Sequence, residues 1–247
     1  MTAKKGSKRT KSVASSGEIE KALADNTNNF SFHFKKREFK FTEKQRSLID
    51  IITNQDTNIV LLNGPAGTSK TMIALYSALL MMKEEKIESI MYLRSVVESA
   101  QKSMGFLKGD VDDKMSYFTA IIDDKMMELV RPEYLPLFKV NNRVETMPLN
   151  YVRGCSWRNK FILADELQNF SKKEILSTMT RIGKGSVMVM AGDPTQSDIN
   201  NSGFQEVFDM FDDEESQEKG IFTFKFTEKD IVRSEIVKYI VDKFQRG

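Results

Sequence analysis

The sequence predicts an α/β domain with a mostly parallel sheet flanked by helices, and two observations carry this prediction. Apolar runs of strand length alternate with segments that have apolar residues at helical spacing. Three of these runs, 58–63, 161–164 and 187–191, are each followed at once by a polar sequence. Because the carboxyl ends of parallel strands meet at one edge of a sheet, we expect these polar sequences to form a single ligand site.

Each predicted element rests on its own pattern. The helix over 42–52 has Thr42 before it and Gln45 three residues later, which is the spacing of a capping box. The helix over 110–130 is amphipathic, 143–147 is predicted to be an edge strand, and the acidic segment 209–218 a solvated loop. The remaining strands are predicted over 58–63, 89–94, 161–164, 187–191 and 221–226, and the remaining helices over 71–82, 171–182 and 231–244.

Composition narrows the class of protein. The chain has 247 residues, of which 40% are hydrophobic and 29% charged, which is enough for one domain with a packed core. The net charge of +2 gives no overall sign of a strongly basic nucleic-acid binder. One cysteine and one histidine exclude an internal disulfide and a metal centre built from several cysteines or histidines.

The amino-terminal sequence predicts a disordered basic tail over 1–29, followed by one domain over 30–247. Five lysines and arginines precede the first acid, Glu18, among serine, threonine and glycine. The tail either contacts nucleic-acid phosphates or is simply solvated, and the sequence favours neither interpretation. No apolar run is long enough to span a bilayer, and no signal-peptide segment is present, so we expect a soluble cytoplasmic protein.

Alternating phenylalanines follow the tail, with basic residues between them. Aromatic side chains in such a pattern can stack nucleic-acid bases. A strand that packs its phenylalanines into the core is the favoured interpretation, because alternation is the period of a half-buried strand. The phenylalanines are Phe30, Phe32, Phe34, Phe39 and Phe41.

The segment 64–71 has the pattern of a phosphate-binding loop between a strand and a helix. Such loops wrap backbone N–H groups around a polyphosphate at a helix N-terminus, where the helix dipole favours negative charge. Lys70 is predicted to reach the β- and γ-phosphates, and the Thr71 hydroxyl to coordinate Mg²⁺. Ser69 departs from the usual glycine, and it is either tolerated, an added hydroxyl donor, or a cause of weaker binding. The predicted nucleotide-binding residues are Gly64, Pro65, Ala66, Gly67, Thr68, Ser69, Lys70 and Thr71.

Acidic and amide side chains follow the other two strands. Asp165 is predicted to hold Mg²⁺ through water, and Glu166 to polarise an attacking water. Gln196 is long enough to contact a γ-phosphate or that water, although the Gly-Asp-Pro sequence before it is equally consistent with a turn without chemistry. Hydrolysis of a nucleoside triphosphate also needs a cation to compensate the developing charge. The sequence does not choose among Arg94, Arg153, Arg181 and Arg233 for this role.

Several segments, in one order, resemble the PhoH family of P-loop ATPases, which is related to superfamily 1 helicases. The segment 64–71 resembles the family's phosphate loop, and 165–169 resembles its Asp-Glu-Ala-Gln-Asn sequence, with Leu167 in place of alanine. The resemblance extends from about residue 41 to residue 244. The other similar segments are 105–110, 148–154, 180–183, 192–198 and 230–233.

The resemblance implies a single RecA-like domain that binds ATP with Mg²⁺ and hydrolyses it. It further implies a helicase-like or translocating ATPase that acts on single-stranded RNA or DNA, with RNA favoured, and a homo-oligomer in the form of a hexameric ring. In such a ring, Arg233 would act on the ATP of a neighbouring subunit as an arginine finger. Gln45 lies in the sequence where helicase-like ATPases use a glutamine to read adenine.

Three functions stay open on the sequence. The preferred one is an ATPase coupled to single-stranded nucleic acid. The second is a ring-forming ATPase that acts on a protein partner. The third is a nucleotide-binding switch, in which Ser69 slows hydrolysis and ATP acts as a structural ligand.

Overall fold

The structure, a computed structural model, describes residues 30–35, 39–94 and 111–232, together with residues 236, 239 and 243. For 111–118 and for residue 150, it describes the backbone alone. The predicted tail over 1–29, the segment 105–110 and Arg233 lie outside the described residues, as does most of the helix predicted over 231–244.

Six strands form one sheet in the order β3-β2-β4-β5-β1-β6, and every neighbouring pair is parallel. The predicted parallel sheet is therefore confirmed, and the strand expected at an edge, β3, does lie at one. The strands are β1 (Ile59–Asn63), β2 (Ser89–Arg94), β3 (Val144–Pro148), β4 (Lys160–Asp165), β5 (Val187–Gly192) and β6 (Ile221–Lys225).

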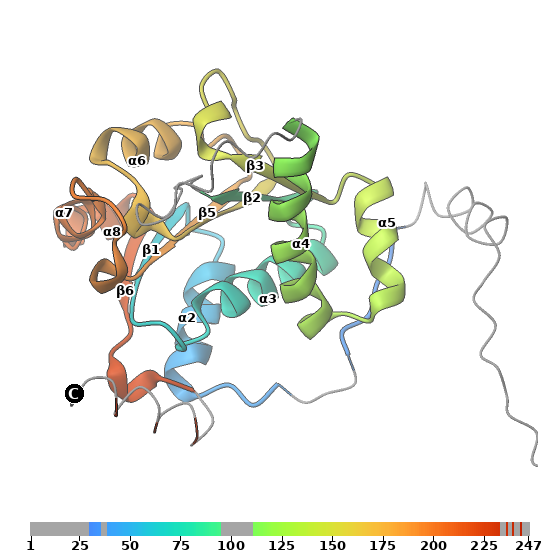
Figure 1. Cartoon of the computed structure of the whole chain (residues 1–247), viewed down its shortest axis with the longest axis horizontal. Helices are drawn as coiled ribbons and strands as arrows, with labels where there is room; N and C mark the ends of the chain where they lie inside the picture. Colours follow the sequence, from blue (N-terminus) through green and yellow to red (C-terminus); the bar gives the residue numbers. More distant parts are fainter. Residues whose placement is uncertain are drawn as a thin grey trace, which may run out of the picture. The chain divides into compact units, whose positions relative to one another are not determined.

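Helices cover both faces of the sheet, with α2 and α3 on one side and α6, α7 and α8 on the other (Figure 1). This layered arrangement is a RecA-like α/β P-loop fold. No helix in the described part of the chain has the length and apolar character needed to cross a membrane. The α-helices are α2 (Glu43–Thr53), α3 (Lys70–Lys83), α4 (Val111–Leu129), α5 (Leu135–Val140), α6 (Lys172–Met179), α7 (Phe204–Met210) and α8 (Glu214–Glu218).

The central strands are buried along nearly their whole length. Every residue of β1 and β5 is buried, and so is every residue of β4 after Lys160. Continuous apolar strands are typical of a parallel sheet that is covered on both faces. On one face, alternate strand residues such as Leu61 and Met190 pack with Phe170 and Phe204 in a single cluster. The sheet is thus rigid up to the point where its strands end and the polar sequences begin.

The aromatic segment before α2 is not the strand that its alternation predicted. Its described residues form only an isolated bridge, between Phe34 and Val130. The rings of Phe34, Phe39 and Phe41 instead surround Tyr76 of α3, with centroids 5.2, 5.4 and 4.8 Å from the Tyr76 centroid. The segment is extended without a strand partner because its rings pack on a helix. The expectation that these rings contribute to a packed cluster was right, and the strand was wrong.

The acidic segment 209–218 is likewise not a simple loop. Helix α7 ends at Met210, and α8 begins after Asp213. The Asp213 carboxylate accepts a hydrogen bond from Ser216 N–H at 2.7 Å, which is an N-cap. The acids Glu214 and Glu215 lie in the first turn, where the helix dipole stabilises negative charge. The segment is mostly exposed, as the prediction of a solvated segment implied, but local capping makes part of it helical.

Candidate functional site

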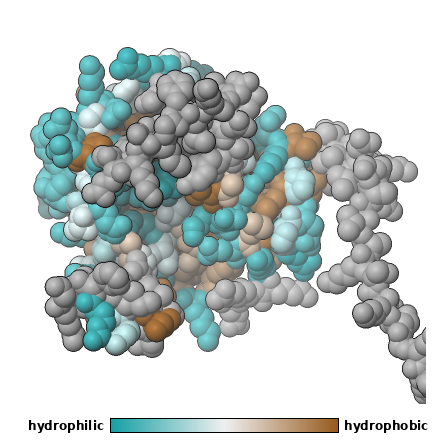
Figure 2. Space-filling model, viewed as in Figure 1, coloured by the Kyte–Doolittle hydropathy of each residue, from teal (hydrophilic) through white to brown (hydrophobic). Residues whose placement is uncertain are grey.

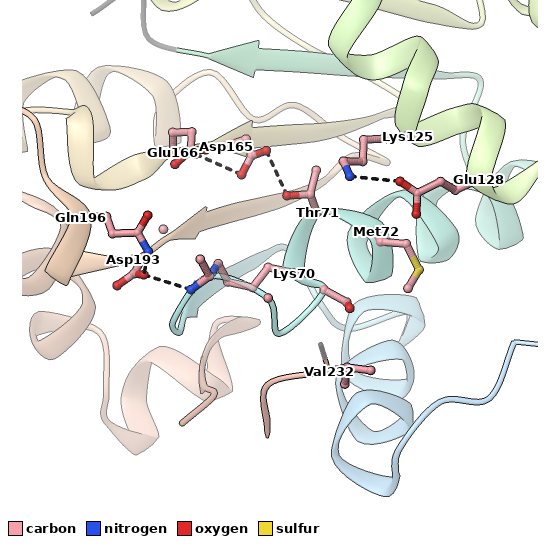
Figure 3. A pocket seen from close by; sticks show the side chains of 14 residues that line it. Lys70, Thr71, Met72, Lys125, Glu128, Asp165, Glu166, Asp193, Gln196 and Val232 are labelled. Atoms are coloured by element: carbon pink, nitrogen blue, oxygen red, sulfur yellow. Dashed lines mark hydrogen bonds and ion pairs between the residues drawn. The ribbon is translucent and has the colours of Figure 1, made fainter. Parts of the chain in front are cut away.

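The order of the strands brings the three polar strand ends to one edge of the sheet. β5 lies between β1 and β4, and Asn63 at the end of β1 pairs with Gly192 at the end of β5. The loop after β1, Asp193 after β5 and Asp165 at the end of β4 therefore lie together, as the sequence predicted. They line a cavity of about 320 Å³, to which α4 contributes Lys125 and Glu128 (Figure 3).

The loop over 64–71 contains two residues in the left-handed region of backbone space. Gly67 has φ of 88°, and Ser69 has φ of 66° and ψ of 26°. A residue with a Cβ atom loses about 1–2 kcal/mol in this conformation. The left-handed backbone thus explains why glycine is usual at the position of Ser69. The serine holds the same turn under strain. Gly64 is fixed by packing, since a Cβ there would lie 2.6 Å from Phe226 Cβ.

The Lys70 side chain curls back over the loop. Its Nζ donates to Gly64 O at 2.6 Å and to Pro65 O at 3.1 Å. Helix α3 begins at Lys70, and its first backbone hydrogen bond runs from Ile73 N–H to Ser69 O at 2.9 Å. The N–H groups of the preceding turn have no acceptor within the helix, which leaves them available to an anion. Lys70 and this helix end together give the cavity its positive end.

Thr71 and Asp165 meet at the other side of the same cavity. The Thr71 hydroxyl donates to Asp165 Oδ2 at 3.0 Å, and Tyr92 OH donates to the same oxygen at 3.2 Å. Glu166 N–H donates to Asp165 Oδ1 at 3.0 Å. Burial, and then the nearby Glu166 carboxylate, raise the pKa of Asp165 above its ordinary value. Burial, and then Asp165, also raise the pKa of the Tyr92 hydroxyl.

This pair of oxygen ligands suits Mg²⁺. Magnesium prefers hard oxygen donors and is usually held by one or two protein groups, with phosphate oxygens and water completing its shell. In the described part of the chain, no group of three or more histidines, cysteines, aspartates or glutamates could hold a metal ion. Thr71 and Asp165 are thus two oxygen donors that could hold Mg²⁺ together with a phosphate ligand.

Glu166 is held from two sides. Its backbone is left-handed, with φ of 56° and ψ of 45°. Gln168 Nε2 donates to Glu166 Oε2 at 2.7 Å, and Arg94 from the end of β2 lies 3.5 Å from Glu166 Oε1. The carboxylate is therefore oriented by an amide and a guanidinium beside the cavity. The sequence predicts a role for Glu166 and none for Gln168.

Gln168 also connects Glu166 to the end of β5. This side chain is only 2% exposed, and its Oε1 accepts from Asp193 N–H at 3.0 Å. Asp193 Oδ2 in turn accepts from Ala66 N–H at 3.1 Å and from Gln196 Nε2 at 2.6 Å. A chain of hydrogen bonds thus runs from the phosphate loop to Glu166. Gln196 lines the cavity as predicted, while its part in chemistry stays a prediction.

Gln45 lies in the wall of a second cavity, of about 370 Å³, beside the first. Gln45 N–H donates to Thr42 Oγ1 at 3.2 Å, and Thr42 N–H donates to Gln45 Oε1 at 3.1 Å, which confirms the predicted capping box. Gln45 Nε2 donates to Thr68 O at 3.5 Å. The amide therefore ties α2 to the loop, and its reading of adenine stays a prediction.

The structure separates the four arginines. Arg94 alone among those described contacts a predicted site residue, Glu166. Arg153 is exposed in the turn that follows β3. Trp157 N–H donates to Arg181 O at 3.0 Å, and because Trp157 precedes β4, Arg181 lies at the opposite edge of the sheet. Arg233 lies outside the described residues.

A parallel sheet with a phosphate-binding loop after β1 and an acidic end on β4 defines a P-loop NTPase fold. The sequence profile of the family described as "PhoH-like protein" matches residues 40–245. The chain belongs to the PhoH family, which is a family of P-loop ATPases.

The relatives that the chain resembles have names of the same family. The chain is 33% identical over 209 residues to a PhoH-like protein of Synechocystis sp., an alignment that covers 83% of this chain and 62% of that protein. It is 31% identical over 209 residues to a PhoH-like protein of Mycobacterium tuberculosis, which covers 83% of this chain and 57% of that protein. The similarity to the protein PhoH2 of Bacillus subtilis is 30% over 159 residues, covering 63% and 36%. The chain thus spans about three fifths of the PhoH-like relatives.

Replacing Ser69 by glycine is expected to stabilise the ligand-free protein. Glycine adopts the φ of 66° without a Cβ clash, and the gain exceeds the extra chain entropy of glycine in the unfolded state by about 0.5–1 kcal/mol. The melting temperature should rise by roughly 1–4 °C in a domain of this size. Ser77→Gly, inside α3, is the control and should lower the melting temperature. A Ser69→Gly variant that melts at or below the parent temperature would show that the loop is not strained there.

Replacing Asp165 by asparagine is expected to raise the melting temperature of the protein without Mg²⁺ or nucleotide. Because the pKa of Asp165 is raised in the folded state, folding takes up a proton. The free energy of unfolding therefore falls as pH rises from the ordinary pKa of an aspartate to the raised pKa of folded Asp165. Asparagine does not ionise, so its burial brings no such loss of stability at higher pH. The advantage of Asp165→Asn over the parent should therefore be larger at pH 8 than at pH 5 in thermal melts. An advantage that grows toward acid pH would contradict this assignment.

Proposed function

We propose that this chain binds ATP with Mg²⁺ and hydrolyses it in the cavity between the loop over 64–71 and Asp165. The observation that carries the proposal is the 3.0 Å contact of the Thr71 hydroxyl with Asp165 Oδ2, in the same cavity as Lys70. Membership of a P-loop ATPase family supports it. Phosphoryl transfer needs a phosphate cradle, a metal and a positioned water, and the residues around this cavity can serve all three.

Each residue has a role in this proposal. The loop N–H groups and Lys70 bind the β- and γ-phosphates, and Thr71 and Asp165 hold Mg²⁺, which neutralises phosphate charge when bound. Glu166 polarises the attacking water, in an orientation set by its contacts with Arg94 and Gln168. Gln196 contacts the γ-phosphate or that water. Gln45, which lines the second cavity, contacts the base in this proposal.

We further propose that hydrolysis is coupled to single-stranded nucleic acid, with RNA favoured over DNA. Support comes from the resemblance to helicase-related ATPases and from the basic sequence over 1–29. A ring-forming ATPase that acts on a protein partner is the alternative. The third candidate is a slow nucleotide-binding switch, in which the strained backbone of Ser69 slows hydrolysis.

Steady-state ATP hydrolysis with Mg²⁺, with and without single-stranded RNA or DNA, tests the function. Lys70→Ala should lose both ATP binding and turnover. Glu166→Gln should keep ATP binding and lose turnover by at least about 100-fold, since only the water-polarising group changes. Glu166→Gln turnover at the parent rate would exclude Glu166 as the base.

The same assay separates the candidate functions. Turnover that rises with RNA or DNA would support the nucleic-acid motor. Turnover that is indifferent to both would favour a protein-directed ATPase, and ATP binding without turnover would favour the switch.

We also propose that the protein assembles into a homo-oligomer, with a hexameric ring as the expected form. Val232, Ile236 and Tyr239 near the carboxyl terminus expose 57%, 62% and 57% of their surface. Figure 2 shows exposed hydrophobic atoms at its lower left, where the C-terminal segment lies in Figure 1. Val232 N–H donates to Gly67 O at 2.9 Å, which places Val232 next to the phosphate loop. Arg233 follows at once, so a subunit contact there would suit its predicted role as an arginine finger.

Light scattering in the presence of ATP and Mg²⁺ tests the assembly. The parent should have a mass several times that of the monomer of 28.3 kDa. Tyr239→Ser should shift the protein toward monomer. Leu176→Ser is the matched control, because Leu176 on α6 is 61% exposed and lies outside the C-terminal segment. A parent protein that stays monomeric under these conditions would remove the proposed assembly.

A further inference from the structure

The two cavities of the site share one wall. The first contains the phosphate loop and the ends of β4 and β5, and the second contains Phe41 and Gln45. Four described residues line both cavities: Ser69, Met72, Glu128 and Val232. Any ligand that occupies both cavities at once must pass along this shared wall.

A nucleotide bound as proposed above has such a shape. Its phosphates would occupy the cavity of Lys70 and Thr71, and its base the cavity of Phe41 and Gln45, where aromatic faces are available for stacking. The ribose connects base and phosphate, so it falls at the shared wall. Met72, in the first turn of α3, adjoins the helix end that would bind phosphate. This position fits the sugar, which follows directly on the innermost phosphate.

Glu128 is the one carboxylate among the described residues of the shared wall. Met72 and Val232 have no side-chain group that accepts a strong hydrogen bond, and Ser69 belongs to the loop itself. The two hydroxyls of a ribose are donors, and an ionised carboxylate is the strongest acceptor that a protein offers them. Figure 3 shows Glu128 on the α4 side of the cavity, above Met72.

Lys125, one turn earlier on α4, forms an ion pair with Glu128 at 3.0 Å. The two side chains are 42% and 55% exposed, so the Glu128 carboxylate keeps an oxygen that is accessible from the cavity. Lys125 lines the phosphate cavity and Glu128 lines both, as expected if the pair is seated over the sugar and the adjoining phosphate. The ion pair orients the carboxylate without burying it.

We propose that Glu128 determines sugar specificity by accepting hydrogen bonds from the ribose hydroxyls of the bound nucleotide. The inference rests on the proposed binding of ATP and adds to it a preference for ribonucleotides over deoxyribonucleotides. A site that hydrogen-bonds a substrate hydroxyl rejects the analogue without it. Because Glu128 is partly exposed, the preference should be about five- to tenfold, which is just below the range for a hydrogen bond to a charged group.

The test compares dissociation constants for ATP, 2′-deoxy-ATP and 3′-deoxy-ATP, with Mg²⁺ present, by calorimetry. The parent should bind ATP about five- to tenfold more tightly than at least one deoxy analogue. Glu128→Ala should bind ATP about as weakly as the parent binds that analogue and should bind the analogue unchanged. Glu128→Gln, which keeps an acceptor without charge, should keep part of the preference.

Glu84→Ala is the matched control. Glu84 is also 55% exposed and pairs with Lys86 at 2.9 Å, but it lies at the far end of α3 and outside both cavities. This variant should keep the full preference of the parent. A parent that binds ATP and both deoxy analogues equally, or a Glu128→Ala variant that keeps the parent preference, would overturn the inference alone. A parent that binds no ATP would overturn the proposed function together with the inference.

Discussion

The geometry of the site depends on the hydrogen bonding of β5 between β1 and β4. The phosphate loop follows β1 and Asp165, the proposed magnesium ligand, ends β4, so one strand separates the two halves of the site. The register that pairs Asn63 with Gly192 makes β1 and β5 end at the same level. Asp193 then fills the space between them, accepting from the loop at Ala66 and donating its N–H to Gln168. A shift of β5 by one residue would turn Asp193 to the other face and break this connection.

The site concentrates backbone strain at its two chemically important turns. Ser69 and Glu166 are both left-handed and both line the phosphate cavity. Of the other non-glycine residues with positive φ in the described part of the chain, Asn142 and Asn159 are of the type that tolerates this conformation best, and Glu85 lies in the turn after α3. Strain of this kind persists only where the surrounding structure holds it, and here the buried sheet and the hydrogen bonds of Gln168 do so. The rigid core thus supports the strained turns.

The sequence predicted the parts of this site that are local and missed those that depend on packing. The loop, the acid pair and the parallel sheet follow from short patterns and from the rule that strand ends meet at one edge. The burial of Gln168 and the position of Glu128 depend on which strand and helix become neighbours, so no local pattern marks them. The alternation of phenylalanines before α2 failed for a different reason. An extended segment whose rings pack on Tyr76 has the same period as a strand.

The contact between Val232 N–H and Gly67 O joins the phosphate loop to the C-terminal segment, and Lys44 of α2 holds the same segment through Asp230 at 2.8 Å. The loop therefore cannot reshape around a ligand without acting on the residues that follow Asp230. Thermodynamic reciprocity then applies: by whatever factor a nucleotide changes the affinity of that segment for its contacts, those contacts change the affinity for the nucleotide by the same factor. Nucleotide affinity measured on dilute protein thus describes the limit in which the segment has no partner. Wherever the segment has a partner, the nucleotide affinity should vary with protein concentration.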